Sequence, residues 1–136
     1  MSTRVETVRR AFPAFAARDV AALRALMTPD VEILVALPEL AGKPAVFRKT
    51  RYVGHAGLRE WLAEVEADFT ELTLEAREIE AIGDVVLALG TLAYESGSSS
   101  GGGMTIAWLC QFTGDRVSTI ETYWDWSEAR RAAERG

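Results

Sequence analysis

Three side chains in this sequence could act as acids or bases in a reaction. His55 is the only histidine, and histidine ordinarily titrates near neutral pH, so it could serve as a general acid or base. Glu32 and Asp125 supply carboxylates, the first early in a predicted strand and the second just after the last one. Each also has a structural explanation. His55 fits the half-exposed first turn of a helix, Glu32 fits a solvent-facing position, and Asp125 fits the cap of a terminal helix.

The sequence contains no pattern typical of a metal or cofactor site. Its single cysteine, Cys110, cannot form an intrachain disulfide, and among apolar neighbours it should behave as a small hydrophobic residue. No second histidine or cluster of carboxylates accompanies His55, and the phosphate-binding pattern GxxxxGK[ST] does not occur. We therefore expect neither a metal nor a cofactor.

Composition limits the partners and the location of the protein. The chain has 136 residues, of which 49% are hydrophobic and 26% charged, which is typical of a single globular domain spanning residues 1–136. A net charge of -5 argues against nucleic acid, because phosphate binding favours a basic surface. No apolar run approaches the roughly 20 residues that cross a bilayer, and the N-terminus lacks the apolar core of a signal peptide. We expect a cytoplasmic protein without nucleic-acid or membrane partners.

The elements that must position these residues are mainly helical in the first half of the chain. Val8, Phe12 and Phe15 recur at helical spacing and predict an amphipathic helix over residues 4–17. Asp19 is suited to cap the next, shorter helix. The other elements expected here are helices over 20–27 and 55–68, a strand over 31–37 and an irregular segment over 38–53.

After residue 68 the period of the apolar residues changes from 3.6 to 2, which indicates strands. Two Gly-Asp pairs, at 83–84 and 114–115, predict hairpin turns, and the Gly/Ser run over 96–103 predicts a flexible connection. The strands are expected over 69–82, 85–95, 104–113 and 116–124, followed by a short helix through Arg135. Separate helices and strands predict an α+β fold. In it, three helices of the first half wrap a cone-shaped, curved antiparallel sheet, with a short C-terminal helix.

Four segments resemble a known family. They read FAARDVAAL at residues 15–23, MTPDV at 27–31, GHAGLREW at 54–61, and GDRV at 114–117 leading to ETYWD at 121–125. In order and spacing they resemble the SnoaL-like branch of the nuclear transport factor 2-like superfamily, over nearly the whole chain. The resemblance implies the fold but no single activity, since this fold hosts isomerases, cyclases, hydrolases, dehydratases and members without catalysis.

The resemblance allows a comparison with the ketosteroid isomerases, whose chemistry needs a carboxylate base and acidic donors for an oxyanion. The base of those enzymes corresponds to Val35, the principal oxyanion tyrosine to Ala11, and the protonated acid to Trp108. Their supporting tyrosines correspond to Met27 and Leu62. None of these five side chains can exchange a proton in that mechanism, so the sequence is unlike a ketosteroid isomerase.

The resemblance also implies which side chains face a cavity, chiefly alternate residues of the last two strands. Tyr52, with the cations Lys43, Arg48, Lys49 and Arg51, could border its mouth. The alternative is that the aromatic residues simply fill the core. The candidate pocket residues are Val35, Tyr52, Trp61, Ile106, Trp108, Cys110, Ile120, Thr122 and Trp124.

We therefore hypothesise a small-molecule pocket protein that takes a small hydrophobic molecule. It could be an isomerase, cyclase or hydrolase without the ketosteroid isomerase residues, or a binding or dimeric interaction module without catalysis. The resemblance implies a homodimer through the outer face of the sheet, where Leu109, Val117 and Tyr123 are expected to be exposed.

Overall fold

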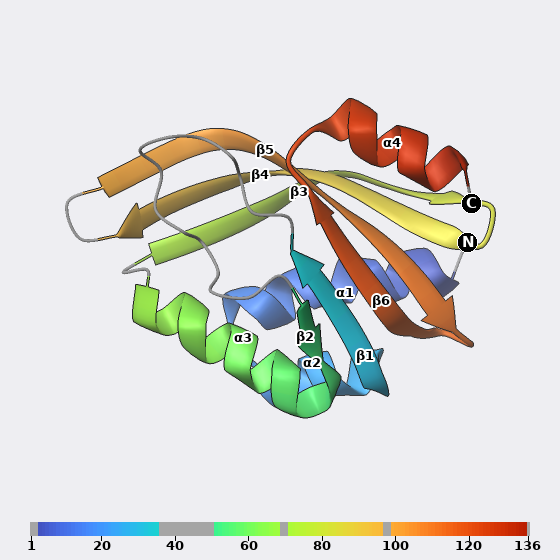
Figure 1. The fold of residues 1–136 in the computed structure, drawn as a ribbon, viewed down its shortest axis with the longest axis horizontal. Helices are drawn as coiled ribbons and strands as arrows, with labels where there is room; N and C mark the ends of the chain where they lie inside the picture. The colour runs from blue at the N-terminus through green and yellow to red at the C-terminus, as the bar shows by residue number, and fades with distance from the viewer. Residues whose placement is uncertain (1–2, 36–50, 69–70, 97–98, 136) are drawn as a thin grey trace.

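The computed structural model describes residues 3–35, 51–68, 71–96 and 99–135, without the side chains of 35, 68, 71, 96 and 99–103. Within this part the chain forms four helices and one curved six-stranded sheet (Figure 1), so the predicted α+β class is confirmed. Along the sheet the strands follow the order β2-β1-β6-β5-β4-β3. The elements are α1 (Thr3–Ala16), α2 (Val20–Leu26), β1 (Met27–Val35), β2 (Arg51–Val53), α3 (Gly54–Asp68), β3 (Glu71–Ile82), β4 (Val85–Ser96), β5 (Ser99–Thr113), β6 (Arg116–Tyr123) and α4 (Trp126–Glu134).

The four long strands β3 to β6 form the predicted antiparallel meander. The sheet as a whole is mixed, however, because β1 runs parallel to β6. Ile33 lies opposite Ile120 in this pair, although the two residues are far apart in the sequence. Local periodicity specifies that a segment is a strand but not the direction of a distant partner, so the parallel pair could not be predicted.

Two segments expected to be irregular are partly strands. Residues 51–53 form β2, which pairs antiparallel with β1 and places Tyr52 opposite Ile33. In the Gly/Ser run, β5 already begins at Ser99, which pairs with Ser96 of β4. In both cases a neighbouring strand supplies backbone hydrogen bonds, and in the Gly/Ser run these outweigh the weak strand propensity of glycine. The predicted loop residues 36–50 and 97–98 lie outside the described residues.

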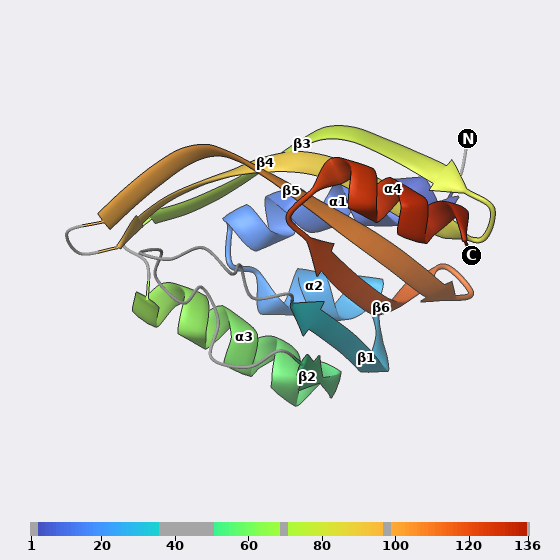
Figure 2. The same ribbon diagram turned by 45° about the horizontal axis from the view of Figure 1, so that its top comes forward.

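Helices cover both faces of the sheet, three on one face and the fourth on the other. Figures 1 and 2 show α1, α2 and α3 on the concave side, with α4 across the other face. α1 packs on β3 and β4, α3 on β1 and β2, and α4 on β5 and β4. None of the described helices is both long and apolar enough to span a membrane.

The sheet therefore has a core on each face. The inner core, between the sheet and α1 to α3, contains Phe15, Leu62 and Trp108 among others. The outer core lies beneath α4, where Ala129 and Ala133 contact strand residues that include Leu87. The small alanines let the helix approach the strands closely, and this brings α4 over what would otherwise be an exposed apolar surface.

The outer core corrects the predicted dimer surface. Leu109 is only 5% exposed because α4 covers it. Val117 is 3% exposed and belongs to the inner core. Its direction is reversed because the β5–β6 register shifts between Gln111 and Phe112, which inserts an extra residue in β6 and moves Val117 to the concave face.

The N-terminal end of α1 is fastened to both hairpin turns of the meander. The Arg4 guanidinium donates from Nε to the carbonyl of Gly114 (3.0 Å) and from Nη1 to that of Asp84 (2.9 Å). It also lies 5.2 Å from the centre of the Phe112 ring. At the next turn of the helix, the Thr7 hydroxyl donates to the carbonyl of Asp115 at 3.0 Å. These contacts fix the position of the N-terminal end of α1 relative to the concave face of the sheet.

Candidate functional site

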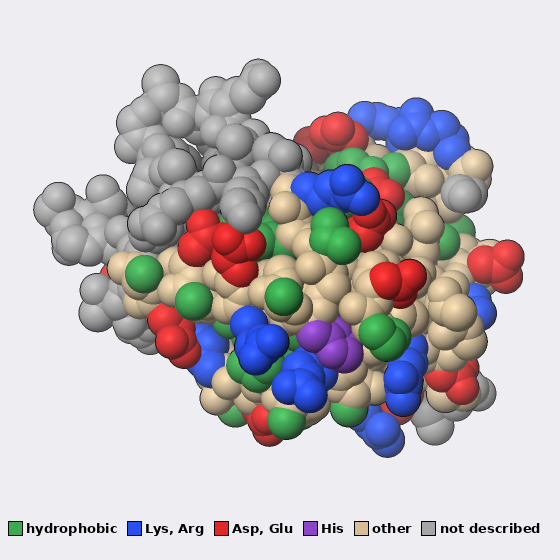
Figure 3. All heavy atoms as spheres, turned by 60° about the horizontal axis from the view of Figure 1, so that its bottom comes forward, with side chains coloured by type: hydrophobic (Ala, Val, Ile, Leu, Met, Phe, Trp, Pro, Cys, Tyr) green, Lys and Arg blue, Asp and Glu red, His purple; other side chains and the backbone are tan. Residues whose placement is uncertain are grey.

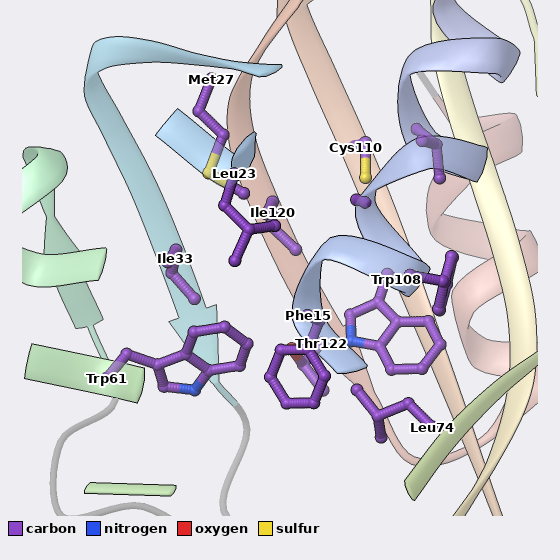
Figure 4. A pocket seen from close by; sticks show the side chains of 13 residues that line it. Phe15, Leu23, Met27, Ile33, Trp61, Leu74, Trp108, Cys110, Ile120 and Thr122 are labelled. Atoms are coloured by element: carbon purple, nitrogen blue, oxygen red, sulfur yellow. The ribbon is translucent and has the colours of Figure 1, made fainter. Parts of the chain in front are cut away.

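A cavity of about 70 Å³ lies between α1 and the concave face of the sheet (Figure 4). Side chains from α1, α2, α3 and four strands converge on it. Its lining consists of Val8, Ala11, Phe12, Phe15, Leu23, Met27, Ile33, Trp61, Leu74, Trp108, Cys110, Ile120 and Thr122.

The periodicities of the elements explain why these residues meet. On α1, Val8, Ala11, Phe12 and Phe15 are spaced three or four residues apart, with one adjacent pair, so they form one face of the helix. On the strands, alternate residues share a face, and therefore Trp108 lines the cavity together with Cys110. The cavity is thus the space left where the apolar face of one helix meets the concave face of the sheet.

Aromatic rings make up much of the wall. The Phe12 and Trp108 rings meet edge to face, with centres 5.1 Å apart and planes at 73°. Phe15 and Trp61 approach to 5.3 Å between ring centres at a tilt of 40°. The guanidinium carbon of Arg18 lies 4.3 Å from the centre of the Phe15 ring. Such packing holds the rings in fixed orientations, so the wall has a defined shape.

The chemistry available in the cavity is restricted. Its lining, as far as the structure describes it, includes no Asp, Glu, Lys, Arg or His. Burial raises the pKa of the Cys110 thiol to about 12, so this group stays protonated at neutral pH. The hydrogen-bonding groups in the wall are the Thr122 hydroxyl and the indole nitrogen of Trp108, because the indole nitrogen of Trp61, whose ring also lines the cavity, is itself buried. The described wall can donate hydrogen bonds but offers no proton acceptor that titrates near neutral pH.

The pocket residues expected from the sequence divide into two groups. Five of them line the cavity, namely Trp61, Trp108, Cys110, Ile120 and Thr122. Tyr52 and Ile106 do not reach it, because they are buried in the surrounding core at 1% and 3% exposure. Trp124 packs against the same core without lining the cavity. The side chain of Val35 is outside the described part of the structure.

The three catalytic candidates lie apart from the cavity lining and on different elements. Glu32 of β1 forms an ion pair with Arg51 of β2, facing away from its neighbour Ile33, which lines the cavity. Asp125 caps α4, because its carboxylate accepts a hydrogen bond from the Glu128 amide at 2.9 Å. Asp125 thus has the capping role that was the alternative to catalysis. Glu32 is partly exposed beside Arg51, in keeping with the solvent-facing position that was its alternative.

His55, the third candidate, is the second residue of α3 and is partly buried. Figure 3 shows the histidine at the surface, beside Lys or Arg side chains. Its Nε2 atom is buried without a hydrogen-bond partner among the described residues. Glu64, on the same helix, is 9% exposed, and its Oε2 atom is likewise buried without a hydrogen-bond partner among the described residues. Neither His55 nor Glu64 lines the cavity.

Among the described residues, no three His, Cys, Asp or Glu side chains gather into a group that could hold a metal. Of the positions that correspond to ketosteroid isomerase residues, Ala11, Met27 and Trp108 do line the cavity. Leu62 is buried beside it in the core. The places where that chemistry would require acids are therefore occupied by apolar groups and one indole.

Apart from Trp61, sequence reasoning missed the contribution of the first half of the chain to the wall, which comes from α1, α2 and β1. Val8, Phe12 and Phe15 were assigned to the apolar face of a helix, and this face was a usable signal, because a helix that covers a concave sheet must turn its apolar side toward it. Leu74 belongs to the alternating apolar face of β3, but the alternation does not indicate that this face meets α1. Its contribution depends on how the curved sheet brings β3 back toward α1.

Comparison with known proteins places this geometry in a family. A model of the SnoaL-like domain matches residues 8–120. No curated protein matches the chain. Among solved structures, an NTF2-like protein of unknown function from Burkholderia pseudomallei K96243 is 25% identical, with a TM-score of 0.75 over 96% of this chain and 97% of that one. TerC co-crystallized with polyporic acid is 24% identical, with a TM-score of 0.76 over 99% and 100%.

A putative SnoaL-like polyketide cyclase from Jannaschia sp. CCS1 is 16% identical, with a TM-score of 0.71 over 98% of this chain and 93% of that chain. At such low identity the likeness concerns the fold alone. The resemblance noted in the sequence is confirmed by the family model, which covers most of the residues that build the cavity. This chain belongs to the family of SnoaL-like domains.

Proposed function

We propose that this protein binds a small, uncharged and mostly apolar molecule in the cavity between α1 and the sheet. The observation that supports the proposal is the lining, in which thirteen residues include no side chain that is ionised at neutral pH. A charged group would lose its hydration in such a site without gaining a partner, which costs several kcal/mol or more. An apolar molecule gains about 25 cal/mol for each Å² removed from water.

The size of the cavity limits the ligand further. A volume of about 70 Å³ is roughly half of the ~150 Å³ apolar cavity that accepts benzene in another protein. A ligand of a few heavy atoms fits the cavity as it stands. A larger ligand must extend beyond the lining or displace one of the aromatic side chains, and Trp108 is the bulkiest side chain from the strands in the wall.

Catalysis of the isomerase, cyclase or hydrolase type is compatible with this proposal only in a restricted form. The described lining supplies no general acid or base, so proton transfers would need the substrate itself, water or residues outside the described part. A rigid apolar wall can still favour one folded conformation of a reactive substrate and so promote its cyclisation. A related structure is named a putative polyketide cyclase. Binding without catalysis is the alternative.

The proposal can be tested by filling the cavity from α1. Ala11 lines the cavity, and Ala16 is exposed on the same helix. Neutral apolar molecules of five to ten heavy atoms, which would extend partly beyond the lining, should raise the melting temperature of the wild type and of Ala16→Leu, and should change the tryptophan fluorescence of both. Ala11→Leu should remain folded and lose this response. The proposal is wrong if no neutral apolar molecule binds, or if Ala11→Leu binds as well as Ala16→Leu.

The predicted homodimer through the outer sheet face is a separate proposal. Because α4 covers β4 and β5 on that face, contacts between two copies would have to involve α4 or the strand residues beside it. Arg131 of α4 is exposed, and Arg131→Glu should weaken such a dimer. Sedimentation analysis over a range of concentrations would detect the change, and a monomer at all concentrations would contradict the proposal.

A further inference from the structure

Two hydrogen-bonding side chains lie next to each other in the otherwise apolar cavity. Trp108 of β5 and Thr122 of β6 are opposite each other in the antiparallel register, and both line the cavity. Residues paired in this way point to the same face, with Cβ atoms typically about 4.5–5.5 Å apart. The indole N–H and the threonine hydroxyl are therefore available to the same small region of the cavity.

Neither side chain uses its hydrogen-bonding group elsewhere in the described part of the chain. No hydrogen bond joins the side chain of Trp108 or Thr122 to another group in the described part of the chain. Each residue is 8% exposed, and neither polar atom is among those sealed inside the protein. Figure 4 shows the indole nitrogen on the edge of the Trp108 ring that is nearer Phe15 and Thr122. The open side of both groups is the cavity.

The orientation of the indole is fixed by its surroundings. The Phe12 ring contacts it edge to face, with ring centres 5.1 Å apart. On its other side Gly90 leaves room for the ring, since a Cβ at that position would lie 3.1 Å from Cζ3 of Trp108. A donor held by packing loses little conformational freedom when it forms a hydrogen bond, so the N–H is prepared for a ligand.

We infer that the ligand carries a carbonyl oxygen, which accepts a hydrogen bond from Nε1 of Trp108 and a second one from the Thr122 hydroxyl. The indole can only donate, and the hydroxyl can rotate to donate beside it. Two converging donors match the two lone pairs of a carbonyl oxygen on an apolar body. This inference rests on the proposed function and deepens it, because it assigns the chemical class of the ligand to small neutral ketones and related carbonyl compounds.

The test uses two probes of nearly equal shape, cyclohexanone and methylenecyclohexane, which differ in an oxygen and a CH₂ group. The indole N–H resonances of ¹⁵N-labelled protein report hydrogen bonding directly, and the spectrum of Trp108→Phe assigns the Trp108 resonance. Cyclohexanone should move that resonance downfield in a saturable way, whereas methylenecyclohexane should not. Trp108→Phe removes the N–H and leaves the same additional space for both probes, so the affinity for cyclohexanone relative to that for methylenecyclohexane should fall about fivefold to tenfold.

Thr122→Val keeps the shape of the side chain and removes the hydroxyl, so it should weaken cyclohexanone binding about twofold to fivefold. Thr119→Val is the matched control, because Thr119 lies on β6 outside the cavity lining. Equal effects of the two threonine variants, or saturable cyclohexanone binding without a shift of the Trp108 resonance, would overturn the inference and leave the proposed function intact. If neither probe binds, the inference fails, and the proposed function fails with it only if no other neutral apolar molecule binds.

Discussion

At Gly90 of β4, the absence of a side chain leaves room for the backbone of β3 and for the ring of Trp108. An ideal Cβ at this position would lie 2.3 Å from the backbone carbonyl oxygen of Glu75 on β3 and 3.1 Å from Cζ3 of Trp108. The carbonyl belongs to the sheet next to the β3 register shift between Ala76 and Glu78, so it cannot simply rotate away. Gly90→Ala should therefore disturb both the β3–β4 pairing and the Trp108 ring.

The expected loss of stability follows from the first of these contacts. A carbon 2.3 Å from a backbone oxygen forces one strand to move, and overpacking of this kind typically costs about 1–3 kcal/mol. For a domain of 136 residues, each kcal/mol lowers the melting temperature by about 3–4 °C, so a decrease of about 3–12 °C is expected. The second contact pushes the indole toward the cavity and should weaken ligand binding.

Thermal unfolding and the Trp108 indole resonance together measure the two effects. Gly114→Ala is the control, because nothing lies within 4 Å of the added Cβ there and only the positive φ of 62° is unfavourable. The control should lose stability without moving the Trp108 resonance or changing ligand affinity. The reasoning is refuted if Gly90→Ala melts at the wild-type temperature, or if its Trp108 resonance stays in place.

Three further predictions concern two groups outside the site, Arg4 and Asp125, and one that lines it, Cys110. Arg4→Ala removes the two hydrogen bonds that fasten α1 to both turns, and calorimetry should show stability lowered by about 1–2 kcal/mol; an unchanged melting curve would contradict this. Asp125→Ala should cost about 1 kcal/mol through loss of the α4 cap, whereas Asp125→Asn keeps an acceptor and most of the stability. Neither change should alter ligand affinity by titration, and a tenfold change would support a catalytic or binding role for Asp125 instead. For Cys110, whose pKa is raised from 9.0 to about 12, the unfolded chain loses its thiol proton first as the pH rises, so stability should fall between pH 9 and pH 12. Urea unfolding across this range should show a shallower decline for Cys110→Ala, and equal slopes would refute the assignment.

The sequence predicted the meander well because its information is local. Each of the last four strands has alternating or continuous apolar residues between Gly-Asp turns, and both turn glycines adopt positive φ, 59° at Gly83 and 62° at Gly114. The family resemblance, rather than the alternation, implied that Trp108 and Thr122 share the concave face. Asp19 caps α2 as expected, since its carboxylate accepts from the Ala22 amide at 3.0 Å.

What could not be predicted depends on contacts between distant parts of the chain. The burial of Leu109 depends on α4 folding back over the sheet, and the burial of Val117 depends on one inserted residue in β6. Tyr52 was expected at a pocket mouth because it lies in a segment predicted to be irregular, yet pairing with β1 turns it into the core. The periodicity of a segment gives its apolar face but not the element that covers this face.

The most direct test of the central claim is a titration of methyl-labelled protein with cyclohexanone, followed by nuclear magnetic resonance. If a small neutral molecule binds in the cavity, saturable shifts should appear at the methyl groups of Leu23, Ile33 and Ile120, which line it. The methyl groups of Leu87 and Leu109, in the outer core beneath α4, should stay unchanged. Shifts confined to the outer core, or no saturable shift at Ile33 and Ile120 with any neutral apolar molecule, would contradict the claim.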